Sequence, residues 1–265
     1  MSSAGPGPSY RGRVAPALQL PRSVLLALWL AAPADARRAT LAVQGEDEPH
    51  VVHRGEDDVV PLVQWLTDSP PAVEVGVALP VPGDPVAVPP PASGPAAQSG
   101  ECVLVARGDG ATAVAVPHVQ RFGSEYEPGH LVRWDVVEVA DWRPAAHAQV
   151  GSLEEAERAL RDGLRTATEA LVELDVASWR ADAADEIATV RDGALTPSRL
   201  PTGLEGQRLR VLTSAARLRA IVRLAARDDG GAVNLWQADQ RSTALREVDR
   251  VARRAMAAAA TRLTR

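Results

Sequence analysis

The densest group of side chains that could do chemistry is an acidic segment, residues 46–58, in which two histidines lie among six carboxylates. Histidine and carboxylate are suitable ligands for zinc or manganese. The spacing argues against such a site, because His50 and His53 would point to opposite faces of a strand and only a helix would bring them together. Pro49 and Gly55 disfavour a helix here. We therefore expect a solvated acidic loop without a metal, and a metal site at His50 and His53 is the alternative.

Acid–base chemistry near neutral pH could also come from two histidines expected at strand ends or in loops, His118 and His130. Paired with Glu125 or Asp135, either one could form an enzyme site between the edge of a sheet and the helices that follow. The chain has no G-x-S-x-G nucleophile motif and neither of the common glycine-rich phosphate-binding motifs. The sequence therefore predicts no particular reaction and no cofactor.

The composition is typical of a folded globular protein, with 46% apolar and 24% charged residues. All 29 basic residues are arginine, an excess that is typical of a GC-rich genome, so arginine content alone is poor evidence for phosphate binding. The single cysteine, Cys102, excludes an intramolecular disulfide. It lies in an apolar run, so we expect a buried and inert thiol.

Charge is distributed unevenly along the chain. Residues 1–150 hold 10 arginines and 17 acids, a net −7, whereas residues 199–265 hold 14 arginines and 6 acids, a net +8. A basic helical module could contact nucleic-acid phosphates. The overall charge of −5 and the lack of interleaved aromatic residues instead favour arginines that pair with acids elsewhere in the chain. Nucleic acid is therefore not expected as a partner.

The N-terminal region allows two interpretations. Residues 1–17 are rich in glycine, proline and serine, which predicts a disordered leader. The apolar run 23–32 follows several arginines and precedes an A-x-A sequence, as in a secretory signal, so a cleaved signal within residues 1–36 remains open. The run is too short to span a bilayer. We favour an ordinary core helix in a cytoplasmic protein without membrane attachment.

Residues 18–148 predict an α+β domain. Apolar residues alternate from Ala72 onward, as expected for a strand with one buried face. Gly108 to Gly110 would join two further strands as a hairpin, because glycine tolerates the positive φ of a tight turn. The proline-rich stretch 80–100 is expected to be irregular. The expected helices are residues 20–32, 34–44 and 59–66, and the later strands are residues 101–107, 111–117 and 131–142. Together they predict a small, mainly antiparallel sheet with short helices on one face.

Residues 151–265 predict a helical domain. Ser152 and Glu155 form a capping box at its start. Behind it, four stripes of apolar residues recur at spacings of three and four, which predicts a four-helix bundle-like region. The last stripe is rich in small side chains at Ala252, Ala255 and Ala259, which could allow close approach of a second copy or a protein partner.

Short motifs carry a resemblance to a known group of sequences. The motifs are Gly83–Val86, Gly100–Leu104, Asp228–Val233 and Asp249–Ala255. With them the chain resembles a family of uncharacterised proteins from GC-rich bacteria, and the similarity covers the whole helical half. The resemblance implies no activity. In these relatives the stretch before Gly100 tends to be a helix; the prolines of residues 89–95 depart from this pattern, which puts any site lined by that helix in doubt here.

These observations favour a non-enzymatic bacterial protein that acts through protein–protein contact or small-ligand sensing. A homodimer or a protein partner would bind through the last helix. The alternatives are an enzyme with a histidine–carboxylate site between sheet and helices, and a basic helical module that binds nucleic acid.

Overall fold

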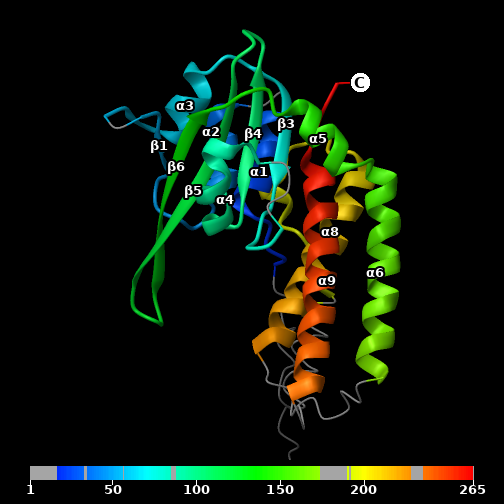
Figure 1. The fold of residues 1–265 in the computed structure, drawn as a ribbon. Coiled ribbons are helices and arrows are strands. Elements are labelled where there is room, and N and C mark those ends of the chain that lie inside the picture. The colour runs from blue at the N-terminus through cyan, green and yellow to red at the C-terminus, as the bar shows by residue number, and fades with distance from the viewer. Residues whose placement is uncertain are drawn as a thin grey trace, which may run out of the picture.

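The computed structural model describes residues 17–32, 35–55, 57–84, 88–173, 190, 192–227 and 235–264. Within these residues, helices and a six-stranded sheet build an α+β fold (Figure 1). The strands are β1 (Val51–His53), β2 (Val59–Pro61), β3 (Ala72–Ala78), β4 (Cys102–Arg107), β5 (Thr112–Gly123) and β6 (Pro128–Glu138). The helices are α1 (Arg22–Leu30), α2 (Ala36–Gln44), α3 (Leu62–Asp68), α4 (Pro90–Ser99), α5 (Arg143–Val150), α6 (Leu153–Glu173), η2 (a 3-10 turn, Pro197–Arg199), α8 (Gly206–Arg227) and α9 (Leu235–Ala260).

The sheet is mixed, in the order β2-β1-β6-β5-β4-β3. β1 and β6 run parallel, and the other neighbouring strands are antiparallel. The predicted hairpin forms between β4 and β5, and Gly110 adopts a φ of 88° in its turn. β5 and β6 are long and project beyond the other strands as a two-stranded arm (Figure 1).

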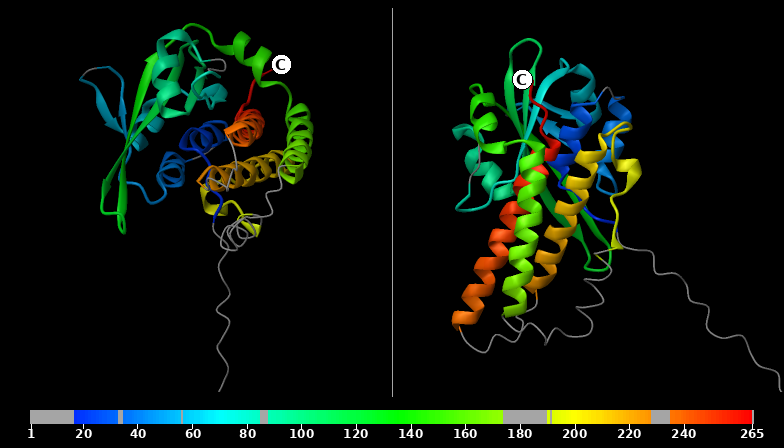
Figure 2. Two further views of the ribbon diagram at one scale, coloured as in Figure 1. Left: turned by 60° about the horizontal axis from the view of Figure 1, so that its bottom comes forward. Right: turned by 90° about the vertical axis from the view of Figure 1, so that its right-hand side faces the viewer.

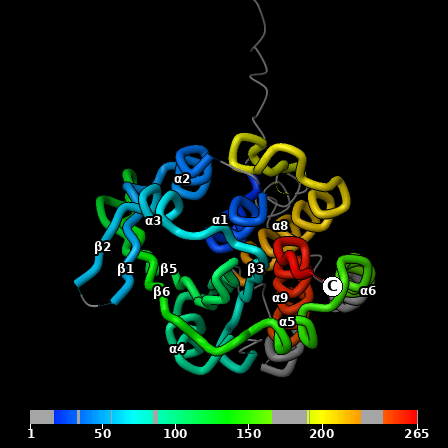
Figure 3. Tube along the Cα trace, turned by 90° about the horizontal axis from the view of Figure 1, so that it is seen from above, coloured from blue at the N-terminus to red at the C-terminus, as the bar shows by residue number. Residues whose placement is uncertain are grey.

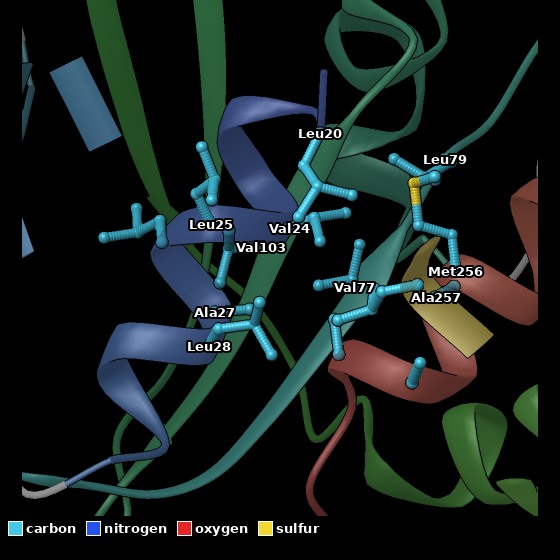
Figure 4. Close-up of a cluster of buried hydrophobic side chains, with 14 of the residues drawn as sticks. Leu20, Val24, Leu25, Ala27, Leu28, Val77, Leu79, Val103, Met256 and Ala257 are labelled. Atoms are coloured by element: carbon cyan, nitrogen blue, oxygen red, sulfur yellow. The ribbon is translucent and has the colours of Figure 1, made fainter. Parts of the chain in front are cut away.

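Helices cover both faces of the sheet, whereas the sequence suggested one. Val77 and Val103 point toward α1 and the end of α9, as Figure 4 shows, and belong to the main hydrophobic core. The alternate side chains, among them Leu104 and Val114, pack on the opposite face against α4 and α5. Figure 2 shows the sheet between these two helical layers. The apolar run at the start of the chain is the centre of the larger layer, because α1 is buried along nearly its whole length.

Two predicted elements between residues 59 and 100 are wrong, and proline explains both. The expected helix 59–66 is instead β2 followed by α3, because Pro61 ends the strand and lies at the N-cap of the helix. The expected irregular stretch 80–100 contains α4, whose first positions, Pro90 and Pro91, need no backbone N–H donors. Ala92 and Ala96 bury this helix against the sheet. The chain therefore does not depart here from the helix expected of its relatives.

Three long helices of the C-terminal half, α6, α8 and α9, lie side by side in Figure 1. The capping box is confirmed: Glu155 N donates to Ser152 Oγ and Ser152 N donates to Glu155 Oε2. Leu160, Leu218 and Val248 are buried, as the apolar stripes predicted. The remaining predicted stripe, at Val176, Trp179, Ala183 and Ile187, lies outside the described residues, so the fourth helix stays a prediction.

The alanine face of α9 is buried inside its own chain. Ala252, Ala255 and Ala259 are at most 1% exposed and belong to the main core. The predicted dimer through these three residues is therefore wrong. The small side chains instead let α9 pack closely against α6, α8 and α1.

The last residues connect the helical half to the sheet. Arg262 exchanges two backbone hydrogen bonds with Val75 and covers the outer edge of β3. Thr264 donates to Glu74 Oε1 through both its N–H and its hydroxyl. At the other end of the chain, Leu18 bridges to Leu195. No helix in the described part of the chain is both long enough and apolar enough to cross a membrane.

Candidate functional site

A polar cavity of about 1150 Å³ lies where four elements meet. These are the N-terminal end of α1, the C-terminal end of α2, the turn η2 and the middle of α8. Figure 3 shows α1 with α2 and the yellow segment around η2 close by. Among the charged residues of its lining are the arginines Arg22, Arg38, Arg199, Arg219 and Arg223, and the acids Glu46, Asp47 and Glu101.

Arg22, at the first turn of α1, is held by Asp47. Its Nε donates to Asp47 Oδ2 at 2.6 Å and its Nη2 donates to Oδ1 at 2.8 Å, a two-pronged pairing in which both oxygens are used. Burial disfavours the charged form of Asp47, but the hydrogen bonds and charge of Arg22 outweigh it and hold the pKa of Asp47 below its usual value. The Arg22 guanidinium is therefore fixed in direction at the cavity wall.

Asp47 also contacts His50, which holds it in place. Trp134 Nε1 donates to His50 Nδ1 at 3.2 Å, and His50 Nε2 lies 3.2 Å from Asp47 Oδ2. Because the indole can only donate, Nδ1 is the acceptor and Nε2 carries the proton that it donates to Asp47. Burial lowers the pKa of His50 to about 4, so the ring is neutral at pH 7. Trp134, His50, Asp47 and Arg22 thus form one continuous hydrogen-bonded chain.

The predicted solvated acidic loop is only partly correct. Glu46 and Glu48 are exposed, but His50 is only 1% exposed, because Trp134, 84 residues away, covers it. Both nitrogens of His50 are engaged by protein groups, so neither is available as a metal ligand. His53 lies in β1, and among the described residues no group of three or more potential ligands is placed to hold a metal ion.

Arg199 enters the same cavity from η2. Its Nε donates to Ala42 O and its Nη2 to Val43 O, both at 2.8 Å, so it satisfies carbonyls at the end of α2. A side chain at Gly45 would meet the guanidinium, since a Cβ there would lie 3.0 Å from Arg199 Cζ, and the φ of Gly45 is +60°. Glycine at this position therefore allows the guanidinium to lie flat over the chain. Burial lowers the pKa of Arg199, and the nearby charge of Asp47 opposes this.

Glu101 and Arg219 complete the cavity wall. Ser23 donates to Glu101 Oε2 through its N–H and its hydroxyl, both at 2.7 Å, which holds this carboxyl group at the start of α1. Burial raises the pKa of Glu101, against the hydrogen bonds from Ser23 and the charges of Arg22 and Arg219. Arg219 Nε donates to Asp249 Oδ1 at 3.2 Å, which ties α8 to α9. The neighbouring Cys102 is fully buried, as expected, and burial raises the pKa of its thiol to about 12.

The other histidine candidates are placed on opposite faces of the β5–β6 arm. His130 Nδ1 lies 3.4 Å from Asp47 Oδ1 at the cavity, a partner that the sequence analysis did not suggest. His118 Nε2 lies 3.0 Å from Asp135 Oδ2 on the other face. Glu125 lies in the exposed turn of the arm, away from both. The structure thus joins His118 with Asp135 and leaves Glu125 separate.

Many arginines of the basic C-terminal region pair with acids of the chain. Arg253 donates to Asp84 and Asp249, Arg254 to Asp84, and Arg250 to Glu247. These pairs agree with the interpretation in which the positive charge of the helices is balanced within the molecule.

The fold and the site define an α+β protein with a mixed six-stranded sheet, covered by helices, and with an arginine-lined cavity beside its central helix. Residues 23–150 match the family model described as the N-terminal domain of Rv1486c-like protein, and residues 154–257 match the model of its C-terminal domain. The chain belongs to the Rv1486c-like family, which confirms the resemblance drawn from the short motifs. No curated protein and no solved structure matches the chain.

Proposed function

We propose that the protein is a non-enzymatic ligand-sensing protein that binds a small oxyanion in the arginine cavity. The observation that carries the proposal is the way in which Arg22, Arg199 and Arg219 line one cavity, each held by a different partner in the protein. A guanidinium presents planar pairs of donors that match carboxylate and phosphate groups.

The electrostatics of the cavity support an anionic ligand. Five lining arginines outnumber three lining acids, and for one of these acids, Glu101, burial raises the pKa of the carboxyl group. Asp47 is already occupied by Arg22 and His50, so it has less capacity to attract a cation. Because the arginines are held before a ligand arrives, binding would cost little side-chain entropy.

The test is calorimetric titration with inorganic phosphate, sulfate and citrate. We expect saturable binding of at least one of them, weakened about tenfold or more in Arg22→Gln, because one charge-assisted contact at a desolvated site is worth about 1.5–3 kcal/mol. Arg22→Lys keeps the charge but loses the two-pronged geometry, and should bind with intermediate affinity.

The matched control is Arg133→Gln. Arg133 pairs with Asp135 through Nε and Nη2, as Arg22 does with Asp47, but it lies where β6 pairs with β1 and not in the cavity. The affinity of Arg133→Gln for the anion should stay within about twofold of that of the wild type. Absence of binding by all three anions, or equal loss in the two glutamine variants, would refute the proposal.

An enzyme remains the second candidate, and one contact favours it. His130 is the histidine at the cavity wall, with its Nδ1 near Asp47 Oδ1, so it could accept a proton from a bound ligand. The test is His130→Gln: a catalytic role requires loss of turnover with little change in anion affinity. We further propose that the protein is bacterial and cytoplasmic, and that a protein partner binds at other surfaces.

A further inference from the structure

A second cavity of about 990 Å³ adjoins the first. It is lined by the loop from Val81 to Asp84, by the C-terminal end of α8 and by α9 from Ser242 to Arg253. Arg223 lines both cavities. The pair of Arg219 and Asp249 also connects them, since Arg219 lines the first cavity, Asp249 lines the second, and their side chains are 3.2 Å apart.

The second cavity differs from the first in chemistry. Its lining includes the apolar side chains Val81, Val222, Ala225 and Leu245. Several of its charged groups are paired with each other, so they attract a further ion less strongly.

Arg253 is the clearest of these paired groups. It is 3% exposed, and its three nitrogens donate to Asp249, Leu79 O and Asp84. Arg250 is also paired, because its side chain donates to the carboxylate of Glu247. A cavity with an apolar lining and internally neutralised charge suits a hydrocarbon group better than a second anion.

We propose that the ligand is a single-chain amphiphile: an oxyanion head group bound among Arg22, Arg199 and Arg219, with an aliphatic chain that extends past Arg223 into the second cavity. This inference rests on the proposed function, because the head group occupies the arginine cavity. The shared chemistry is an anionic head with a hydrocarbon tail, which an alkyl phosphate and an aliphatic carboxylate both have.

The experiment is a calorimetric series of alkyl phosphates from methyl to octyl, at concentrations at which they remain monomeric, with inorganic phosphate as reference. Each buried methylene should tighten binding about fourfold, the equivalent of about 0.8 kcal/mol. A parallel series of aliphatic carboxylates identifies the preferred head group. Octyltrimethylammonium, which has the same tail on a cation, should bind far more weakly than octyl phosphate.

Ala226→Trp tests where the tail lies. Ala226 is exposed and lines the second cavity only, so an indole there fills that space without entering the core. In Ala226→Trp we expect the affinity to depend no longer on the length of the alkyl chain. The affinity for inorganic phosphate should stay within about twofold of the wild type. The matched control is Ala148→Trp on α5, another exposed helical alanine, which should leave the whole series unchanged.

The outcomes separate the two proposals. If inorganic phosphate binds but octyl phosphate binds no more tightly, the amphiphile is refuted and the proposed anion site stands. The amphiphile is also refuted if Ala226→Trp leaves the chain-length dependence intact, or if the octyl cation binds as well as the octyl anion. If no alkyl phosphate or carboxylate binds, and inorganic phosphate, sulfate and citrate do not bind either, the proposed function fails together with the amphiphile.

Discussion

The molecule contains two clusters built from the same three types of side chain. In one, Arg22, Asp47 and His50 lie beneath the sheet, and the histidine side chain is fully buried. In the other, Arg133, Asp135 and His118 lie on the opposite face of the sheet, where β6 pairs with β1 and β5, and each is about one-third to one-half exposed. The distances are similar, but the first cluster is the more deeply buried one, and a fourth residue, Trp134, holds its histidine. Burial, and not residue type or separation, therefore distinguishes the two clusters.

The strongest test of this comparison replaces each of the two aspartates by asparagine in turn. Asp47→Asn should lower the free energy of unfolding by about 3 kcal/mol, because it leaves the Arg22 guanidinium without its counter-charge in a partly buried position. Asp135→Asn should lower it by less than about 0.5 kcal/mol, since solvent replaces an exposed ion pair. Urea denaturation measures both, and equal effects would show that burial does not distinguish the clusters.

The pH dependence of stability should be dominated by the buried cluster. The pKa of His50 is lowered to about 4 in the folded protein from its usual 6.5, so between these values the unfolded chain binds more protons. Stability should therefore fall by roughly 3 kcal/mol as the pH is lowered from 6.5 to 4. In His50→Gln, the unfolded chain should bind about one proton fewer relative to the folded protein in this pH range, so the slope of the unfolding free energy against pH should be smaller. An unchanged slope in the variant would contradict the buried, neutral state of His50.

Trp134→Phe should have a moderate effect. The ring stays apolar, but His50 Nδ1 loses its donor, at a cost of about 2 kcal/mol for an unsatisfied buried acceptor. The tautomer of His50 provides a more specific measurement, because nitrogen chemical shifts distinguish protonation at Nε2 from protonation at Nδ1. We expect only the Nε2–H form in the wild type. A substantial Nδ1–H population there would refute the proposed direction of the hydrogen-bonded chain.

The smallest effect is expected in the exposed cluster. Arg133→Gln should change the free energy of unfolding by about 0.5 kcal/mol or less, and added salt should remove even this difference. Urea denaturation at low and high ionic strength is the measurement. A loss as large as that in Asp47→Asn would contradict the small contribution expected of this exposed ion pair.

Features that depend on neighbouring residues were predictable from the sequence. The capping box of α6, the hairpin of β4 and β5, and the burial of α1 are each specified by residues within one or two turns of chain. The elements at Pro61 and Pro90 differ from the expectation for opposite reasons: the expected helix 59–66 runs through Pro61, which instead separates β2 from α3, and the expected irregular stretch 80–100 contains α4, which begins at Pro90.

The site was largely missed, since its parts come from segments far apart in the sequence. The local pattern places His50 in a solvated acidic loop, and only its contact with Trp134, on β6, makes it a buried group. The local pattern contained no signal of this contact. Arg199 was equally hidden, because it reaches α2 from more than 150 residues away. A signal that points to this contact is Trp134 itself, which lies between Arg133 and Asp135 in the strand and is a residue that needs both burial and a hydrogen-bond acceptor.

The most direct test of the central claim is a titration of the protein, labelled with nitrogen-15 in arginine, with inorganic phosphate. If the buried cluster positions a binding site, the guanidinium signals of Arg22 and Arg199 should shift together and saturate, while the signal of Arg133 stays in place. Shifts confined to Arg133 and other exposed arginines, or no saturable shift at all, would contradict the account.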